Sequence, residues 1–165
     1  MPPKSKPPQP QGGQRSLLHS FRDAFRGIGY GIKSERNMRI HVLACGYVLL
    51  FALQTGVSRV ELALLLLAMG AVTAAEALNT AVEKLSDFVK PSRDKRIGWI
   101  KDVAAGGVLL SALFAALAGG VILLRPELWQ VLVEMVKTPW KLSLFVASLG
   151  AGMLFVFVVP LKRGK

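Results

Sequence analysis

The sequence predicts an all-α fold, a polytopic membrane helix bundle with an N-terminal amphipathic surface helix and three to four transmembrane helices. Hydrophobic residues make up 52% of the 165 residues, and the mean hydropathy is +0.44. Two uncharged segments are long enough to cross a bilayer as helices. The chain is also basic, with 21 Lys and Arg against 10 Asp and Glu. Such a basic and apolar chain is typical of a membrane protein with cationic segments and argues against a nucleic-acid binder.

The N-terminal region predicts a tail followed by a surface helix. Residues 1–14 are mainly Pro, Gln, Gly, Lys and Ser, so we expect them to be disordered. From Ser16 to about Lys33, apolar residues recur every three or four positions, which predicts a helix with one apolar stripe. A cationic stripe that includes Arg22 and Arg26 lies beside it. The pair of stripes favours a helix in the headgroup plane, although a soluble packing helix with a solvated charged face remains the alternative.

Four spans are predicted after this helix. The first is uncharged but needs extra turns at its ends to cross the bilayer, whereas the third has 22 residues without a charge, about 33 Å as a helix. Before the fourth span, residues 127–137 form an amphipathic segment with an interfacial Trp. The spans cover residues 40–53, 62–89, 103–124 and 142–161.

The domain organisation and orientation follow from these segments. We expect a cytosolic tail over residues 1–14, a membrane domain of the surface helix and three spans over 15–124, and an amphipathic segment plus a fourth span over 125–165. A cytosolic N-terminus places 17 basic residues inside and 4 outside. The positive-inside rule therefore predicts that both termini and the 84–101 connection face the cytosol.

The most informative segment is EALNTAVEKLSD, Glu76 to Asp87. Its polar residues are spaced so that they share one face of one helix. They are Glu76, Asn79, Thr80, Glu83 and Asp87. Ionisable residues within a span are costly and indicate function, although a polar stripe that only joins helices is the structural alternative.

Phosphoryl transfer is a chemistry that this face suits. It needs carboxylates for Mg²⁺, cations for the developing charge and a base for the attacking hydroxyl. The polar face supplies the first and the last, and Lys101 and Asp102 add a cation and an acid at the start of the third span. Glu35, just before the first span, is expected at the same membrane depth. The Gly27–Ser34 segment is not a P-loop, because Ile32 stands where that motif requires Gly.

These motifs resemble a known family. EALNTAVEKLSD, followed by Lys101, Asp102 and the run VAAGGVLL, resembles the signature of the small prokaryotic diacylglycerol kinases and undecaprenol kinases. The upstream SERNMRIH resembles the segment that enters their first span, and the likeness covers about residues 20–124. It implies an ATP- and Mg²⁺-dependent lipid kinase of the prokaryotic cytoplasmic membrane. The substrate would be a membrane alcohol, undecaprenol or diacylglycerol, and the protein would be a homotrimer.

The same resemblance implies roles for single residues. Glu76 would be the general base that takes the proton of the lipid hydroxyl, while Glu35 and Glu83 would hold Mg²⁺ with the nucleotide. The ATP site would be lined by Asn79, Asp87, Lys101 and Asp102. A basic or polar residue of the surface helix would bind the nucleotide's phosphates, with Arg15, Arg22 and Arg26 as the candidates. The basic loop over 91–96 and the segment over 126–165 depart from the family pattern.

Two other classes of function compete with the kinase. A carrier or channel component could use Glu76, Glu83 and Asp87 to relay protons or cations. It would require polar residues through the full depth of the bundle, whereas here they gather on one side. A membrane anchor that recruits acidic partners through its basic loops would leave the intramembrane carboxylates without a role.

Overall fold

The structure is a computed structural model that describes residues 17–90, 92 and 94–160. Every regular element in these residues is a helix, as predicted. They are α1 (Leu17–Ser34), α2 (Arg36–Thr55), α3 (Arg59–Val89), α4 (Lys95–Leu123), α5 (Pro126–Lys137), α6 (Pro139–Met153) and the π-helix η1 (Leu154–Val158). The tail predicted for residues 1–14 lies outside the described residues, as does Arg15.

Four helical segments are long and apolar enough to cross a membrane, which confirms the four predicted spans. They are α2, α3, α4 and the α6–η1 segment. With 31 and 29 residues, α3 and α4 are about 46 and 43 Å long, which exceeds the bilayer's apolar core of about 30 Å. Their surplus turns therefore extend beyond the apolar core.

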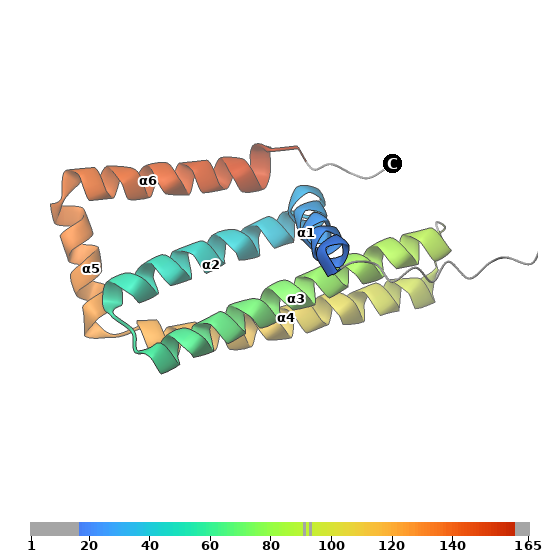
Figure 1. The fold of residues 1–165 in the computed structure, drawn as a ribbon, viewed down its shortest axis with the longest axis horizontal. Helices are drawn as coiled ribbons and strands as arrows, with labels where there is room; N and C mark the ends of the chain where they lie inside the picture. Colours follow the sequence, from blue (N-terminus) through green and yellow to red (C-terminus); the bar gives the residue numbers. More distant parts are fainter. Residues whose placement is uncertain (1–16, 91, 93, 161–165) are drawn as a thin grey trace, which may run out of the picture.

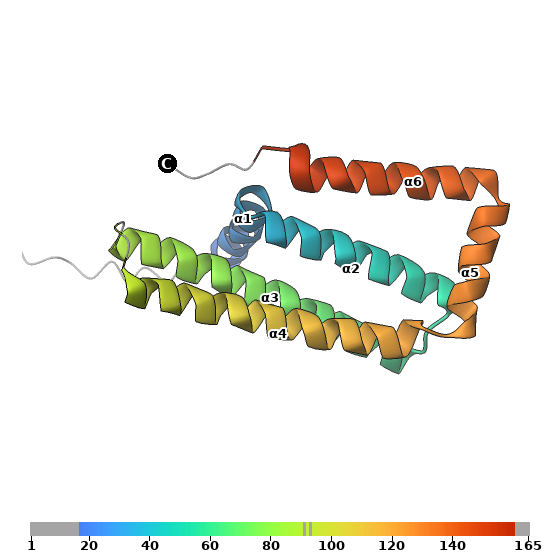
Figure 2. The same cartoon turned by 180° about the vertical axis from the view of Figure 1, so that it is seen from behind.

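The helices form a row in which α2 lies between α6 and the α3–α4 pair (Figures 1 and 2). The helices α3 and α4 run side by side along most of their lengths. At one end of the bundle α1 crosses the spans, and at the other end α5 connects α4 to α6. We call these the α1 end and the α5 end. The polar face of α3 lies toward the α1 end.

Local signals explain where the helices of the α5 end begin and stop. Gly56 has φ +66° and terminates α2 in the left-handed conformation that Gly adopts most easily. Ser58 and Glu61 form a reciprocal capping box at the start of α3. Glu61 also pairs with Arg125, in the turn between α4 and α5. The start of α3 is therefore tied to the end of α4.

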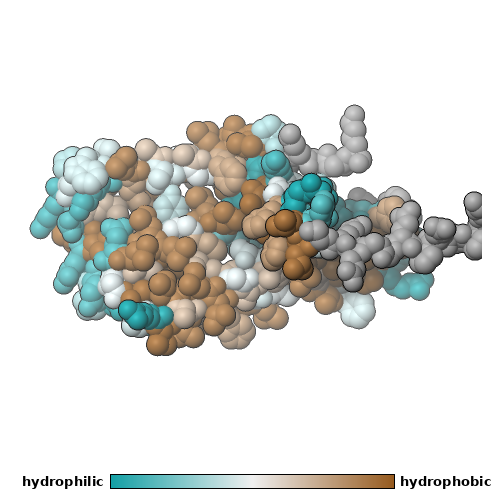
Figure 3. Space-filling model, in the orientation of Figure 1, coloured by the Kyte–Doolittle hydropathy of each residue, from teal (hydrophilic) through white to brown (hydrophobic). Residues whose placement is uncertain are grey.

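Large apolar side chains point mainly away from the bundle, as expected of a chain surrounded by lipid. A small buried cluster of Ala52, Leu65 and Ile122 joins α2, α3 and α4. Figure 3 shows apolar surface over the middle of one face and hydrophilic groups toward the ends. The apolar stripe of α1 is also left uncovered, with Phe25 71% exposed. This exposure favours a helix on the membrane surface over a soluble packing helix.

Candidate active site

The polar face of α3 is buried at its centre. Glu76 is only 2% exposed, and Asn79 and Thr80 are also buried. One turn further along, Glu83 is half-buried and its Oε1 accepts a hydrogen bond of 3.4 Å from Asn79 Nδ2. The i, i+3, i+4 and i+7 spacing thus brings two carboxylates and an amide onto one protected stripe.

Glu35 reaches this stripe from the junction between α1 and α2. It is the one residue between the two helices, and its backbone is extended, with φ −119° and ψ 124°. Its side chain makes no capping hydrogen bond at the start of α2. Instead Glu35 Oε1 lies 3.0 Å from Lys84 Nζ on α3. Of the acids in the described residues, Glu35 and Glu83 are those whose charges act on Glu76. We call these three residues the carboxylate cluster.

Several buried polar atoms around the cluster have no hydrogen-bond partner among the described residues. They are Ser34 Oγ, Glu35 Oε1, Glu76 Oε2, Asn79 Oδ1 and Thr80 Oγ1. The Lys84–Glu35 contact is therefore an ion pair without hydrogen-bond alignment. Four of these atoms also lack an ion-pair partner among the described residues, and because most buried polar atoms in proteins are paired, we treat them as candidates for contacts to a ligand.

The donor set fits a magnesium ion that shares its coordination with a nucleotide. Mg²⁺ prefers oxygen ligands and usually takes one or two carboxylates together with substrate phosphates. Glu35, Glu83 and the unpaired Asn79 Oδ1 supply such oxygens. Within the described ranges, no group of three or more His, Cys, Asp or Glu could hold a metal alone. A metal here would accordingly need ligands from a bound substrate.

The remaining predicted residues lie outside the buried stripe. Asp87 is exposed and pairs with Lys101 across the α3–α4 contact. Both line a cavity of about 410 Å³ at the α1 end, together with residues of the loop between α3 and α4. Asp102 and Arg22 are exposed, and neither makes a hydrogen bond or ion pair to another described residue. The structure therefore does not bring these two into contact with the carboxylate cluster.

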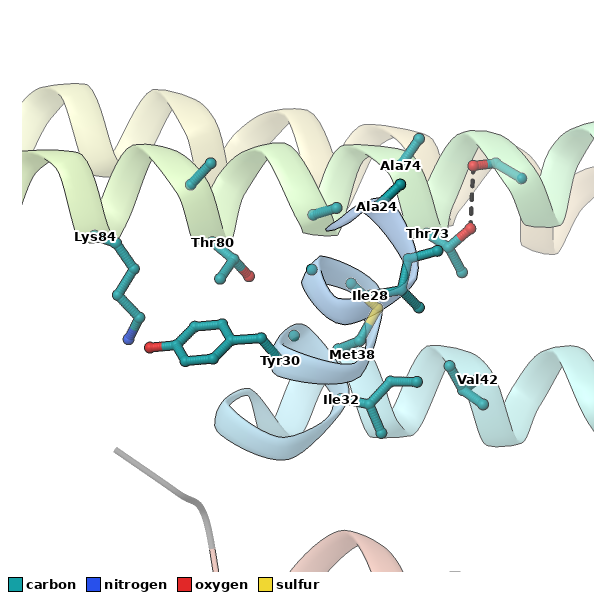
Figure 4. Close-up of a pocket in the computed structure, with 15 residues that line it drawn as sticks. Ala24, Ile28, Tyr30, Ile32, Met38, Val42, Thr73, Ala74, Thr80 and Lys84 are labelled. Atoms are coloured by element: carbon teal, nitrogen blue, oxygen red, sulfur yellow. Dashed lines mark hydrogen bonds between the residues drawn. The ribbon is translucent and has the colours of Figure 1, made fainter. Parts of the chain in front are cut away.

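A groove of about 710 Å³ lies between α1, α2 and α3 (Figure 4). Most of its wall is apolar, with Ile28, Met38 and Val42 among its residues. At one end the side chains of Lys84 and Tyr30 point toward each other, next to Thr80. Lys84 lines the groove and pairs with Glu35, and Thr80, which lies one helical turn after Glu76, also lines it, whereas none of the three acids is among the lining residues.

Comparison with known proteins decides the family. Residues 22–123 match the sequence profile of the prokaryotic diacylglycerol kinases, which is more than half of the chain. The chain belongs to the prokaryotic diacylglycerol kinase family. The profile ends with α4, so α5, α6 and η1 lie beyond the part that matches the diacylglycerol kinases.

Two curated relatives carry kinase names. A protein of Synechocystis sp. named diacylglycerol kinase is 38% identical over 114 residues, which are 68% of this chain and 65% of that protein. The match thus spans just under two thirds of its length. A protein of Bacillus subtilis named undecaprenol kinase is 32% identical over 108 residues, 66% of this chain and 88% of that protein. No solved structure gives a significant match.

Sequence reasoning missed three residues at the candidate site of this prokaryotic diacylglycerol kinase family member, namely Lys84, Ser34 and Tyr30. Lys84 lies four residues after Thr80, so helical spacing could have placed it on the flank of the polar face. Its pairing with Glu35 depends on how α2 approaches α3, which no local pattern specifies. The side chains of Ser34 and Tyr30 likewise gain their positions only from the packing of α1 against α3.

Proposed function

We propose that this chain is a lipid kinase that transfers the γ-phosphoryl group of ATP to the hydroxyl of a membrane alcohol, with Mg²⁺ as cofactor. The observation that supports it most is Glu76, a buried carboxylate with an unpaired oxygen beside two further acids. Family membership and the names of both relatives support the same activity.

In this proposal the groove holds the part of the lipid next to its hydroxyl. The apolar wall contacts the lipid chain, and the alcohol reaches Glu76 past Thr80. Glu76 takes the hydroxyl proton while the lipid oxygen bonds to the γ-phosphorus and the bond from that phosphorus to ADP breaks. Because the base Glu76 lies within the membrane, the insoluble lipid can react without being extracted into water.

In this proposal the other candidate residues would bind Mg²⁺ and the nucleotide. Glu35 and Glu83 would hold Mg²⁺, which supplies positive charge against the phosphates. Asn79, Asp87, Lys101 and Asp102 would contact ATP, and Arg22 would reach its phosphates from α1. Because ATP is cytosolic, the α1 end would face the cytosol of a prokaryotic cell, in agreement with the excess of basic residues at that end.

A homotrimer is part of the proposal. The exposed apolar side chains of α4, such as Leu109 and Phe114, offer a surface that lipid or a second copy can cover. Native mass spectrometry of the purified protein in detergent would measure the oligomer. A monomer at all detergent concentrations would contradict this part.

The activity is tested by γ-phosphate transfer with purified protein, with undecaprenol and diacylglycerol offered separately. We expect phosphorylation of at least one lipid, and loss of activity by a factor of about 10²–10⁴ in Glu76→Gln. This substitution keeps the shape of the side chain and removes the base. Glu127→Gln on the exposed surface of α5 is the matched control and should retain full activity. Wild-type turnover in Glu76→Gln would refute the role of Glu76.

A further inference from the structure

Arg39, in the first turns of α2, is a buried cation that joins three helices. It is 2% exposed and donates hydrogen bonds to five backbone carbonyls. Two acceptors end α1, with Nε 2.7 Å from Ile32 O and Nη2 2.9 Å from Lys33 O. The other three acceptors belong to the end of the fourth span.

The contacts to the fourth span use the carbonyls of η1 and of the residues that follow it. Arg39 Nη1 lies 2.9 Å from Phe155 O and 2.7 Å from Val159 O, and Nη2 lies 3.4 Å from Pro160 O. Helix ends leave carbonyls without helical partners, and such groups are costly where water is scarce. The guanidinium can serve both helix ends at once because it carries five donors in a planar fork.

Further contacts hold the fourth span along α2. The Arg39 guanidinium lies 5.3 Å from the ring centroid of Phe155. Nearer the α5 end, Tyr47 Oη is 3.0 Å from Ser148 Oγ. Between them, a Cβ added at Gly152 would lie 2.8 Å from Leu43 Cδ2, so any larger residue there would displace the Leu43 side chain or the helix. The fourth span therefore contacts α2 at several positions between Ser148 and Pro160.

The Arg39 contacts enclose the corner that carries Glu35. The Glu35 N–H lies 2.9 Å from Gly31 O, and the Arg39 N–H lies 3.4 Å from Glu35 O. With its side chain on the last carbonyls of α1, Arg39 holds the backbone on both sides of Glu35. The same side chain connects this corner to residues more than 110 positions later in the chain.

We propose that Arg39 is a positioning residue through which the fourth span fixes Glu35 for metal binding. The added segment is then part of the framework of the site, even though it supplies no group to the reaction. This inference rests on the proposed function for its catalytic consequence. The mechanical part, that η1 restrains the α1–α2 corner, stands on the contacts of Arg39 alone.

The experiment compares two ways of breaking the anchor with a matched control. Arg39→Gln removes the guanidinium, and Gly152→Leu places a bulky side chain between the last turn of α6 and Leu43, which should displace the adjoining η1 while leaving Arg39 intact. Gly150→Leu adds the same bulk two residues earlier, where nothing lies within 4 Å. Arg39→Lys keeps the charge without the fork, and Leu43→Ala combined with Gly152→Leu restores space at the contact.

Two measurements are made on each full-length variant in lipid nanodiscs. The Mg²⁺ concentration that gives half-maximal phosphoryl transfer reports on the metal site. The electron paramagnetic resonance line shape of a spin label at Lys33→Cys, in a Cys45→Ala background, reports on mobility of the corner without requiring activity. Both background substitutions are included in every labelled variant.

We expect Arg39→Gln and Gly152→Leu each to raise the half-maximal Mg²⁺ concentration about tenfold and to mobilise the label, as loss of a supporting residue does at metal sites. Gly150→Leu should match the wild type, Arg39→Lys should behave like Arg39→Gln, and Leu43→Ala should partly rescue Gly152→Leu. An effect of Arg39→Gln without one of Gly152→Leu would overturn the role of the fourth span. A wild-type protein without kinase activity would refute the proposed function, while the label would still test the anchor.

Discussion

Lys84 Nζ lies 3.0 Å from Glu35 Oε1, so a single ion pair joins α3 to the junction of α1 and α2. Glu35 is the more shielded partner, with its side chain 20% exposed against 45% for Lys84. The positive charge of Lys84 therefore partly neutralises Glu35, whose negative charge also acts on Glu76. A metal ion that binds Glu35 has to compete with this cation.

Replacement of Lys84 by Gln should lower the Mg²⁺ concentration needed for half-maximal activity. The competing ion pair is partly exposed and is worth about 0–1 kcal/mol, so we expect a change of up to about fivefold. Lys141→Gln is the matched control, because Lys141 is also partly exposed but pairs with Glu134 at the α5 end. A higher Mg²⁺ requirement in Lys84→Gln would show that Lys84 supports the metal site.

Exchange of the Asp87–Lys101 pair should separate nucleotide binding from helix pairing. A swapped pair, Asp87→Lys with Lys101→Asp, restores the attraction between α3 and α4 but reverses the charges offered to ATP. Each single substitution and the swap should raise the KM for ATP, by about tenfold for each lost charged hydrogen bond. Recovery of the wild-type KM in the swap would mean that the pair is structural. The thermal unfolding temperature of each variant reports separately on the pairing of α3 with α4.

Loss of the cap at Ser58 should weaken the fold without affecting the site. Ser58 Oγ accepts the Glu61 N–H at 3.2 Å, and its own N–H lies 2.7 Å from Glu61 Oε2. Ser58→Ala should lower the free energy of unfolding by about 1 kcal/mol, measured by titration with sodium dodecyl sulfate. Ser111→Ala removes a hydroxyl that bonds only its own helix and serves as control. Kinase activity should be unchanged, since Glu76 lies about 25 Å further along α3.

Acid should loosen the start of α4. The Lys90 ammonium, together with the Arg96 N–H, holds the pKa of Asp94 below its usual value of 3.8. The contribution of this carboxylate to stability is complete above the unfolded pKa and is lost as the pH falls through the folded pKa. Amide hydrogen exchange in the first turn of α4, corrected for the intrinsic rate, should therefore accelerate only below about pH 4. Asp94→Asn keeps an acceptor that does not titrate, so in this variant the protection of the first turn of α4 against exchange should not depend on pH.

Much of the fold could be predicted because hydropathy and charge specify membrane helices strongly. The largest difference is α4, which begins at Lys95 whereas the uncharged run begins at Val103. The two added turns are polar because they lie beyond the apolar part of the bilayer. Likewise α2 begins at Arg36, directly after Glu35, and includes Arg39 as a buried charge. Hydropathy cannot predict such a residue, because its burial depends on carbonyls from two other helices.

The site was predictable where its residues share one helix and less so elsewhere. Helical spacing placed Glu76, Asn79 and Glu83 on one stripe of α3, and in the structure the first two are buried and Glu83 is half-buried. The residues of other helices that lie against this face, such as Ser34, could not be identified from any local sequence pattern. The π-helical end of the fourth span was not predicted either, since the sequence over 154–158 is uniformly apolar. The side chain that donates to the carbonyls of Phe155 and Val159 is Arg39, which lies 116 and 120 positions earlier in the chain.

The fourth span returns the chain to the end of the bundle where α1 lies. Four crossings are an even number, so α1 and the end of the fourth span belong to the same face of the bilayer, and Figure 1 shows both at the α1 end. A chain with only the first three crossings would present its last turn to the opposite compartment. Compartment-specific reporters fused at either terminus should accordingly give one identical signal, whereas a reporter inserted between α5 and α6 should give the opposite one.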